Sequence, residues 1–152
     1  MTLPTLLTLG YEGADLDAFL ATLSQHGVTL LVDVRERAQS RRRGYSKTAL
    51  ALALKERGIG YVHLRPLGTP PSLRKEYHLS HDFALLERGY QAHLATQGKA
   101  LEELGTLAAR ERACLLCYEM DPGACHRSLI ARRLQTLGLV GEVEHLYVPT
   151  RP

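Results

Sequence analysis

The chain of 152 residues lacks the features that mark membrane, exported and repetitive proteins. No apolar run approaches the roughly 20 residues that a membrane-spanning helix needs. The first ten residues lack the basic and apolar regions of a signal peptide. Internal repeats and low-complexity tracts are also absent. We therefore expect a cytoplasmic protein that does not bind membranes.

Cysteine is scarce and asparagine is missing altogether. Three cysteines are an odd number, and in a chain without an export signal they argue against a disulfide framework. Cys114 falls inside a predicted apolar strand, where we expect a buried packing residue. The absence of Asn, beside 15 Arg and only 4 Lys, is typical of a GC-rich genome.

The overall composition is that of one folded domain. Hydrophobic residues make up 45 % and charged residues 23 %, both close to the globular average. A chain of this length can bury a sizeable core without cross-links. The net charge of +3 is mildly basic, which is less than a purely electrostatic nucleic-acid-binding protein usually carries.

Apolar runs alternate with amphipathic segments along the chain, which predicts strands joined by helical crossovers. The pattern favours an α/β fold: a single domain with a mostly parallel central sheet of about five strands and helices on both faces. The segment 65–81 is rich in proline and polar residues and is predicted to be a long loop or lid with at most one helical turn. Strands are expected at 5–10, 28–34, 59–64, 112–117 and 142–148, and helices at 15–26, 46–57, 82–96, 99–110 and 121–137.

Ligands of open parallel sheets bind beyond the carboxyl ends of the strands, so the residues there are the candidates for function. The first predicted strand ends in Gly10-Tyr11-Glu12-Gly13, a turn that would let backbone amides approach a ligand. The second ends in Asp33-Val34-Arg35. There Asp33 would orient the Arg35 guanidinium toward an anion, or the two would form a structural ion pair at the rim of the sheet.

A basic loop follows the second strand. Arg41, Arg42 and Arg43 are adjacent and have no acidic neighbour, and Tyr45 stands beside them. Such a loop suits phosphate or single-stranded nucleic acid, because arginines bind phosphate oxygens and an aromatic ring stacks on bases. The structural alternative is a solvated loop.

The densest cluster of reactive side chains follows the fourth strand. Cys117 and Glu119 share a face where that strand ends, and Cys125, His126 and Arg127 lie near the start of the next helix. A helix N-terminus lowers the pKa of a thiol, so a cysteine there could be a nucleophile. The same residues could bind a metal, but Cys-x7-Cys-His is not a standard zinc spacing and no metal site is predicted. The third alternative is that these cysteines are only buried packing residues.

Five motifs of the chain occur together, in the same order, in one protein family. On these motifs the chain resembles the family known as domain of unknown function 488, over residues 5 to about 148. The resemblance implies an α/β fold and a bacterial or archaeal cytoplasmic protein, and it implies no established reaction. The motifs are Thr8–Gly13, Val32–Arg35, Ser40-Arg41 with Tyr45-Ser46, Leu67-Gly68, and Leu116–Glu119 with Cys125–Arg127.

A looser resemblance connects the chain to rhodanese-like domains. Val32–Arg35 is similar to the strand that opens those domains, and Cys125–Ala131 to the end of their active loop and the helix after it. That resemblance would imply an anion cradled above a nucleophilic cysteine. Cys117 stands at the corresponding strand end. However, Arg127 follows ten positions later with acidic Glu119 between them, which departs from a tight cradle.

We infer an enzyme that acts on an anionic substrate, either nucleotide-like or nucleic acid, at the carboxyl edge of the sheet. Two other functions fit the same residues: a non-catalytic nucleotide-binding or nucleic-acid-binding module, and a rhodanese-like, redox-active or metal-sensing cysteine protein. The sequence identifies neither a cofactor nor an oligomeric state. The predicted anion-binding residues are Gly10, Tyr11, Glu12, Asp33, Arg35, Arg41, Tyr45 and Arg127. The predicted catalytic residues are Glu119, His126, Cys125 and Cys117.

Overall fold

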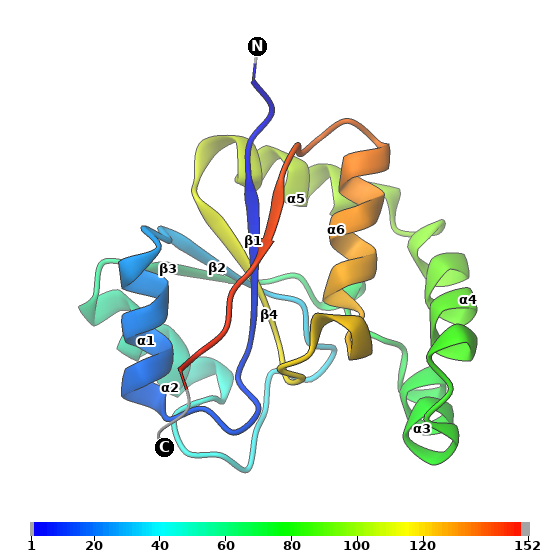
Figure 1. Cartoon of the computed structure of the whole chain (residues 1–152), viewed down its shortest axis with the longest axis horizontal. Helices are drawn as coiled ribbons and strands as arrows, with labels where there is room; N and C mark the ends of the chain where they lie inside the picture. Colours follow the sequence, from blue (N-terminus) through cyan, green and yellow to red (C-terminus); the bar gives the residue numbers. More distant parts are fainter. Residues whose placement is uncertain (1, 150–152) are drawn as a thin grey trace.

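The computed structural model describes residues 2–149 and contains a five-stranded parallel sheet. The strand order is β3-β2-β4-β1-β5, and every neighbouring pair runs parallel. The predicted α/β fold in one domain is therefore confirmed (Figure 1). The strands are β1 (Leu6–Gly10), β2 (Leu30–Asp33), β3 (Gly60–His63), β4 (Ala113–Cys117) and β5 (Val143–His145).

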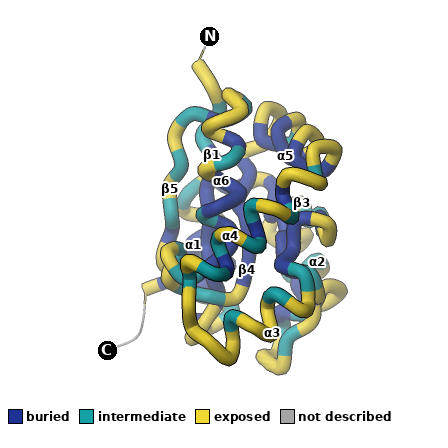
Figure 2. Tube along the Cα trace, turned by 90° about the vertical axis from the view of Figure 1, so that its right-hand side faces the viewer, coloured by how far each residue is buried: buried dark blue, intermediate teal, exposed yellow. Residues whose placement is uncertain are grey.

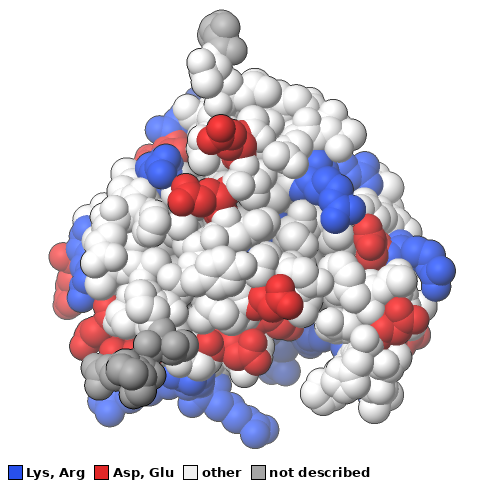
Figure 3. Space-filling view, in the orientation of Figure 1, with Lys and Arg blue, Asp and Glu red and all other residues white. Residues whose placement is uncertain are grey.

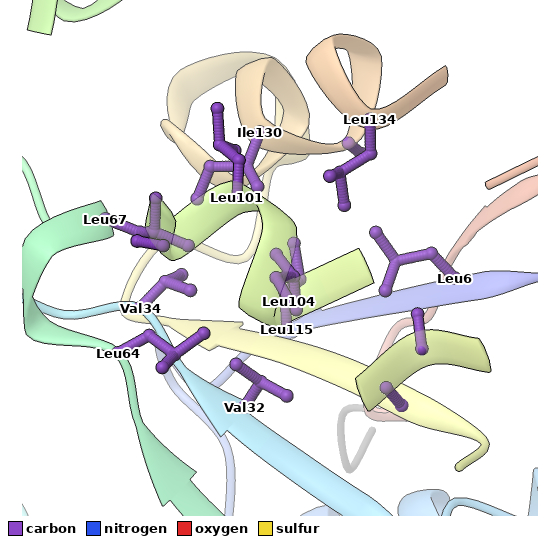
Figure 4. Packing of buried hydrophobic residues seen from close by; sticks show 14 of the residues in the cluster. Leu6, Val32, Val34, Leu64, Leu67, Leu101, Leu104, Leu115, Ile130 and Leu134 are labelled. Carbon is purple, nitrogen blue, oxygen red and sulfur yellow. The ribbon is translucent and has the colours of Figure 1, made fainter. Parts of the chain in front are cut away.

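Helices cover both faces of this sheet. Strand side chains alternate between the faces, so Leu115 packs in one apolar cluster while Leu116 packs in the other. The cluster of Leu115 includes residues of α4, α5 and α6, and Figure 4 shows those of α5 and α6. The opposite cluster includes residues of α1 and α2. Within residues 2–149, no helix is both long and apolar enough to span a membrane. The helices are α1 (Leu16–Gln25), α2 (Lys47–Glu56), α3 (Pro71–Ser80), α4 (Phe83–Leu94), α5 (Gly98–Arg110) and α6 (Arg127–Thr136).

The carboxyl ends of the three central strands, β2, β4 and β1, lie at the same edge of the sheet, and the segments that follow them continue into the lower part of Figure 1. Gly10 of β1 is in register with Cys117 of β4, and Asp33 of β2 is in register with Leu116 of β4. The chain leaves β1 and β2 toward α1 and α2 on one face, whereas it leaves β4 toward α6 on the other. Connections that diverge in this way leave a crevice beyond the strand ends, which is where open α/β sheets bind ligands.

The predicted loop at residues 65–81 is instead largely helical. Arg65–Leu67 form a 3₁₀ turn, and α3 then runs for ten residues. Proline is compatible with the first turn of a helix because the amide hydrogen there needs no helical partner, so Pro71 begins α3. Figure 2 shows that no part of α3 is buried. Its apolar contacts come from two side chains: Leu73 packs against the core and Gly89 of α4, and the Tyr77 ring contacts Phe83. Because none of its residues is buried, hydrophobic periodicity did not predict it.

The predicted helix at residues 121–137 is interrupted near its start. Pro122–Ala124 form a 3₁₀ turn whose first amide is capped by Asp121, and α6 begins only at Arg127. Between the two, Cys125 is extended, with φ −131° and ψ 145°. Cys125 therefore lies before the helix rather than in its first turn, and this backbone conformation directs its sulfur back toward the end of β4.

Candidate functional site

A cavity of about 470 Å³ lies at the carboxyl edge of the sheet. Segments that follow β1, β2 and β4 line it together with α3 and α4. Figure 3 shows the surface hollowed at the lower edge beside the lobe of α3, with Lys and Arg atoms along that edge. The structure brings seven predicted site residues together here: Tyr11, Arg35, Arg41, Cys117, Glu119, Cys125 and His126.

A buried ion pair holds Arg35 in place at the cavity wall. Its Nε and Nη2 donate to the two carboxylate oxygens of Asp33 over 2.9 and 2.7 Å, and its Nη1 donates to the Tyr11 hydroxyl over 3.2 Å. Burial lowers the pKa of Arg35, but the hydrogen bonds and charge of Asp33 raise it by more, so the guanidinium stays charged. A guanidinium has five N–H groups. These three bonds leave two N–H groups for a ligand.

Cys117 and Cys125 form a disulfide bond on the cavity wall. The expectation that the chain has no disulfide is therefore wrong for this pair. Cys114, the third cysteine, is free and buried. It lies three residues before Cys117 on β4, so it packs in the cluster on the other face of the sheet and cannot join the pair.

His126 is oriented by the backbone of the segment after β2. Its Nε2 lies 2.7 Å from the carbonyl oxygen of Val34, and because a carbonyl only accepts, Nε2 carries the proton. The other ring nitrogen, Nδ1, lies 3.6 Å from the Sγ atom of Cys125. Burial lowers the pKa of His126 to about 4, so the ring is neutral at neutral pH. The free lone pair of His126 therefore faces sulfur.

Glu119 is the carboxyl group that lines the same wall. Its Oε2 atom lies 3.7 Å from the Sγ atom of Cys117. Burial raises the pKa of Glu119, against an opposing effect from the charge of Arg127. A partly buried carboxyl group with a raised pKa, placed in a cavity, is a candidate for proton transfer.

Arg127 does not line the cavity, although the sequence predicted that it would bind an anion there. It is fully buried, and its guanidinium donates to the Oγ1 of Thr8 over 3.1 Å and the Sγ of Cys117 over 3.0 Å. It also donates to the carbonyl oxygens of Glu119 and Met120. Because α6 begins at Arg127, the side chain reaches back beneath the segment between β4 and α6. Arg127 therefore stabilises this segment and does not contact a ligand in the cavity.

Four further predicted anion-binding residues lie outside the cavity wall as well. Gly10 is required by packing, because a Cβ atom there would lie 1.8 Å from the carbonyl oxygen of Glu119. Glu12 accepts a hydrogen bond from the backbone amide of Met120. Tyr45 is buried in the core, and its hydroxyl donates to a backbone carbonyl between β1 and α1. Asp33 also stands back from the cavity, where it fixes Arg35 rather than a ligand.

Several lining residues were not predicted from the sequence. Arg74 and Tyr77 are three positions apart on α3, and that spacing places them on one side of the helix. The only sequence signal for them was the long segment 65–81 itself, which was interpreted as a loop. The other unpredicted lining residues are Glu36, Arg37, Gln39, Ser40, Thr69, Leu86, Tyr118 and Ala124.

A family model described as "Domain of unknown function DUF488" matches residues 15–134. The chain belongs to this family. The resemblance predicted from the motifs is thus confirmed, and the matched region of this DUF488 chain includes Arg35, both cavity cysteines and Arg127. No curated protein and no solved structure was found to match the chain. The family description assigns no reaction, so the function of the DUF488 cavity has to be argued from its geometry.

Proposed function

We propose that this DUF488 protein is an enzyme that binds an anionic, nucleotide-like substrate in the cavity at the sheet edge. The observation that carries the proposal is the basic wall of the cavity, which contains four arginines: Arg35, Arg37, Arg41 and Arg74. The Arg35 guanidinium is already oriented by Asp33, so little side-chain entropy is lost when an anion binds. Paired guanidinium N–H groups match the oxygens of phosphate and carboxylate.

The size and aromatic content of the cavity support a nucleotide rather than an inorganic anion. Its volume of about 470 Å³ is within the usual size of small-molecule sites. Tyr77 and Tyr118 line it, and tyrosine rings provide stacking surfaces for bases. Tyr118 is 45 % exposed, so its ring is accessible to a ligand.

Glu119 is the best-placed group for proton transfer. It lines the cavity, and burial raises its pKa. His126 was predicted for the same role. One of its ring nitrogens is hydrogen-bonded to the Val34 carbonyl and the other faces Cys125, so both contact protein groups rather than a bound anion.

The binding step can be tested with two adjacent arginines of the same loop. Arg41 lines the cavity and Arg43 does not, and both side chains are exposed, so the variants Arg41→Ala and Arg43→Ala change the net charge equally. Losing one charge-assisted hydrogen bond costs about 1.5 to 3 kcal/mol, which is roughly 10- to 150-fold in affinity. We expect Arg41→Ala to weaken nucleotide binding at least tenfold and Arg43→Ala to change it less than threefold.

The measurement is a calorimetric titration with nucleoside mono-, di- and triphosphates and a short single-stranded oligonucleotide, at two salt concentrations. If Arg41→Ala and Arg43→Ala lost the same nucleotide affinity, that affinity would come from the positive charge of the whole loop and not from contacts in the cavity. Tight binding of the oligonucleotide with none for mononucleotides would identify a nucleic-acid ligand instead.

Catalysis is tested separately, by incubating the protein with each nucleotide that binds and analysing the products by chromatography. We expect Glu119→Gln to keep nucleotide affinity within about threefold and to lose at least about 100-fold in turnover, the usual contribution of a general acid or base. Nucleotides that bind to the wild type but are never converted would favour the binding-module alternative.

A further inference from the structure

Three potential metal ligands converge on the cavity wall. The Sγ atoms of Cys117 and Cys125 and a ring nitrogen of His126 all lie within 4.8 Å of one another, and all three residues line the cavity. We propose that these residues bind a zinc-like divalent transition-metal ion when the Cys117–Cys125 bond is reduced. The disulfide and the metal ion would then be alternative states of one site. This proposal is independent of the anion-binding function proposed above.

The orientation of His126 is the first argument for a metal. Metal-binding histidines almost always donate their second ring N–H to a carbonyl or carboxylate, which fixes the ring and the free lone pair. His126 donates from Nε2 to the carbonyl of Val34 in this way, and Nδ1 faces Cys125 Sγ at 3.6 Å. In a tetrahedral zinc site with bonds of about 2.3 Å to sulfur and about 2.0 Å to nitrogen, those two ligand atoms are about 3.5 Å apart, close to the distance observed here.

The spacing of the two cysteines is the second argument. Their Cα atoms are 7.4 Å apart, whereas most disulfides join Cα atoms about 4.4 to 6.8 Å apart. Two thiolates on one tetrahedral zinc ion have sulfur atoms roughly 3.8 Å apart, from bonds of about 2.3 Å. Once the bond between Cys117 and Cys125 is reduced, the backbone therefore leaves room for the sulfur atoms to separate around an ion.

The surrounding charges are balanced for a divalent ion. The guanidinium of Arg127 donates to Cys117 Sγ over 3.0 Å, and the Glu119 carboxylate lies 3.7 Å from the same sulfur. Two thiolates, this carboxylate, the guanidinium and a divalent ion have a net charge of zero. Thiolate and imidazole ligands select zinc and similar ions over magnesium or calcium.

Three protein ligands leave a fourth coordination position. The cavity adjoins all three ligands, so this position would be available to Glu119, to water or to a bound anion. A site with three protein ligands and one open position is typical of catalytic rather than structural zinc.

Metal loading requires reduction first. A dithiol reductant transfers two electrons and two protons to the disulfide, so it becomes a disulfide itself and Cys117 and Cys125 become thiols. The divalent ion then displaces the two thiol protons to solvent and forms two metal–sulfur bonds. The cytoplasm that the sequence analysis predicts is a compartment that keeps thiols reduced.

The test uses the full chain with Co²⁺ as a spectroscopic probe. The protein is reduced with dithiothreitol, freed of metal and reductant under nitrogen, and titrated with Co²⁺. We expect one Co²⁺ per chain, thiolate-to-cobalt charge-transfer absorption, and displacement by Zn²⁺. The variants Cys117→Ser and Cys125→Ser should lose at least 100-fold in affinity. Cys114→Ala, which removes the free cysteine on the other face of β4, should keep affinity within threefold.

A second measurement needs no variant and so does not depend on variant folding. Zn²⁺ should protect Cys117 and Cys125 of the reduced wild-type chain from alkylation, with each site identified by mass spectrometry. Equal alkylation of both cysteines with and without Zn²⁺, or no stoichiometric Co²⁺ binding by the reduced chain, would overturn the proposal. Both measurements are made without nucleotide, so a failure here leaves the anion-binding proposal standing, and a failure of nucleotide binding leaves this one standing.

Discussion

Replacing Arg127 by methionine should destabilise the protein strongly, because this buried side chain holds the segment between β4 and α6. Its guanidinium donates to Thr8, to Cys117 and to two backbone carbonyls. Methionine fills much of the same volume and donates nothing, so both carbonyls lose their bond to Arg127. A buried acceptor that loses its hydrogen bond costs about 1 to 3 kcal/mol, so two such carbonyls cost roughly 2 to 6 kcal/mol. Burial lowers the pKa of Arg127, which shows that burying this charge is itself unfavourable, so we expect a net loss in the lower half of that range, about 3 kcal/mol.

The assay is urea denaturation followed by circular dichroism, with wild type and variants reduced alike. Arg132→Met is the matched control on the same helix, because Arg132 pairs with Glu87 at 3.0 Å in an exposed ion pair. Such surface pairs contribute at most about 1 kcal/mol. If Arg127→Met and Arg132→Met lowered the free energy of unfolding by the same small amount, the structural role assigned to Arg127 would be refuted.

Two further outcomes follow from packing around β1 and β4. Gly10→Ala should lower the free energy of unfolding by about 1 to 3 kcal/mol, because its Cβ atom would lie 1.8 Å from the carbonyl oxygen of Glu119. Gly98→Ala, where a Cβ atom meets nothing within 4 Å, should be neutral or stabilising in the same urea assay. Cys114 should resist alkylation in the reduced native chain, because burial raises the pKa of its thiol. Alkylation of Cys114 before the chain is denatured would contradict this.

The sheet could be predicted from the sequence because each strand is a short apolar run ended by a change in composition. The strands predicted at 5–10 and 28–34 contain the observed β1 and β2 entirely. Helix ends were also predictable where glycine has a left-handed conformation, as at Gly27 and Gly58, both with positive φ. The helix α3 was missed because its contacts with α4 come from tertiary packing, and it has no buried face to give a periodic signal.

The sequence predicted those site residues whose place in the fold depends only on their position at the end of a strand. The ends of β2 and β4 placed Arg35, Cys117 and Glu119 at one edge, and all three line the cavity. Position along the chain does not fix the direction of a long side chain, so Arg127 and Tyr45, which are buried structural residues, were assigned to a ligand. The Cys117–Cys125 pairing also depended on an extended residue before α6, which helix propensity did not indicate.

The backbone at Val34 connects the Arg35 side of the cavity with the His126 side. Val34 lies between Asp33 and Arg35, whose ion pair belongs to the proposed anion site, and its carbonyl accepts the hydrogen bond that orients His126 toward Cys125. An anion bound by Arg35 and a metal ion bound by His126 would therefore both be linked to the backbone at Val34. For this reason the nucleotide titration and the metal titration, although independent as tests, examine one continuous site at the carboxyl edge of the sheet.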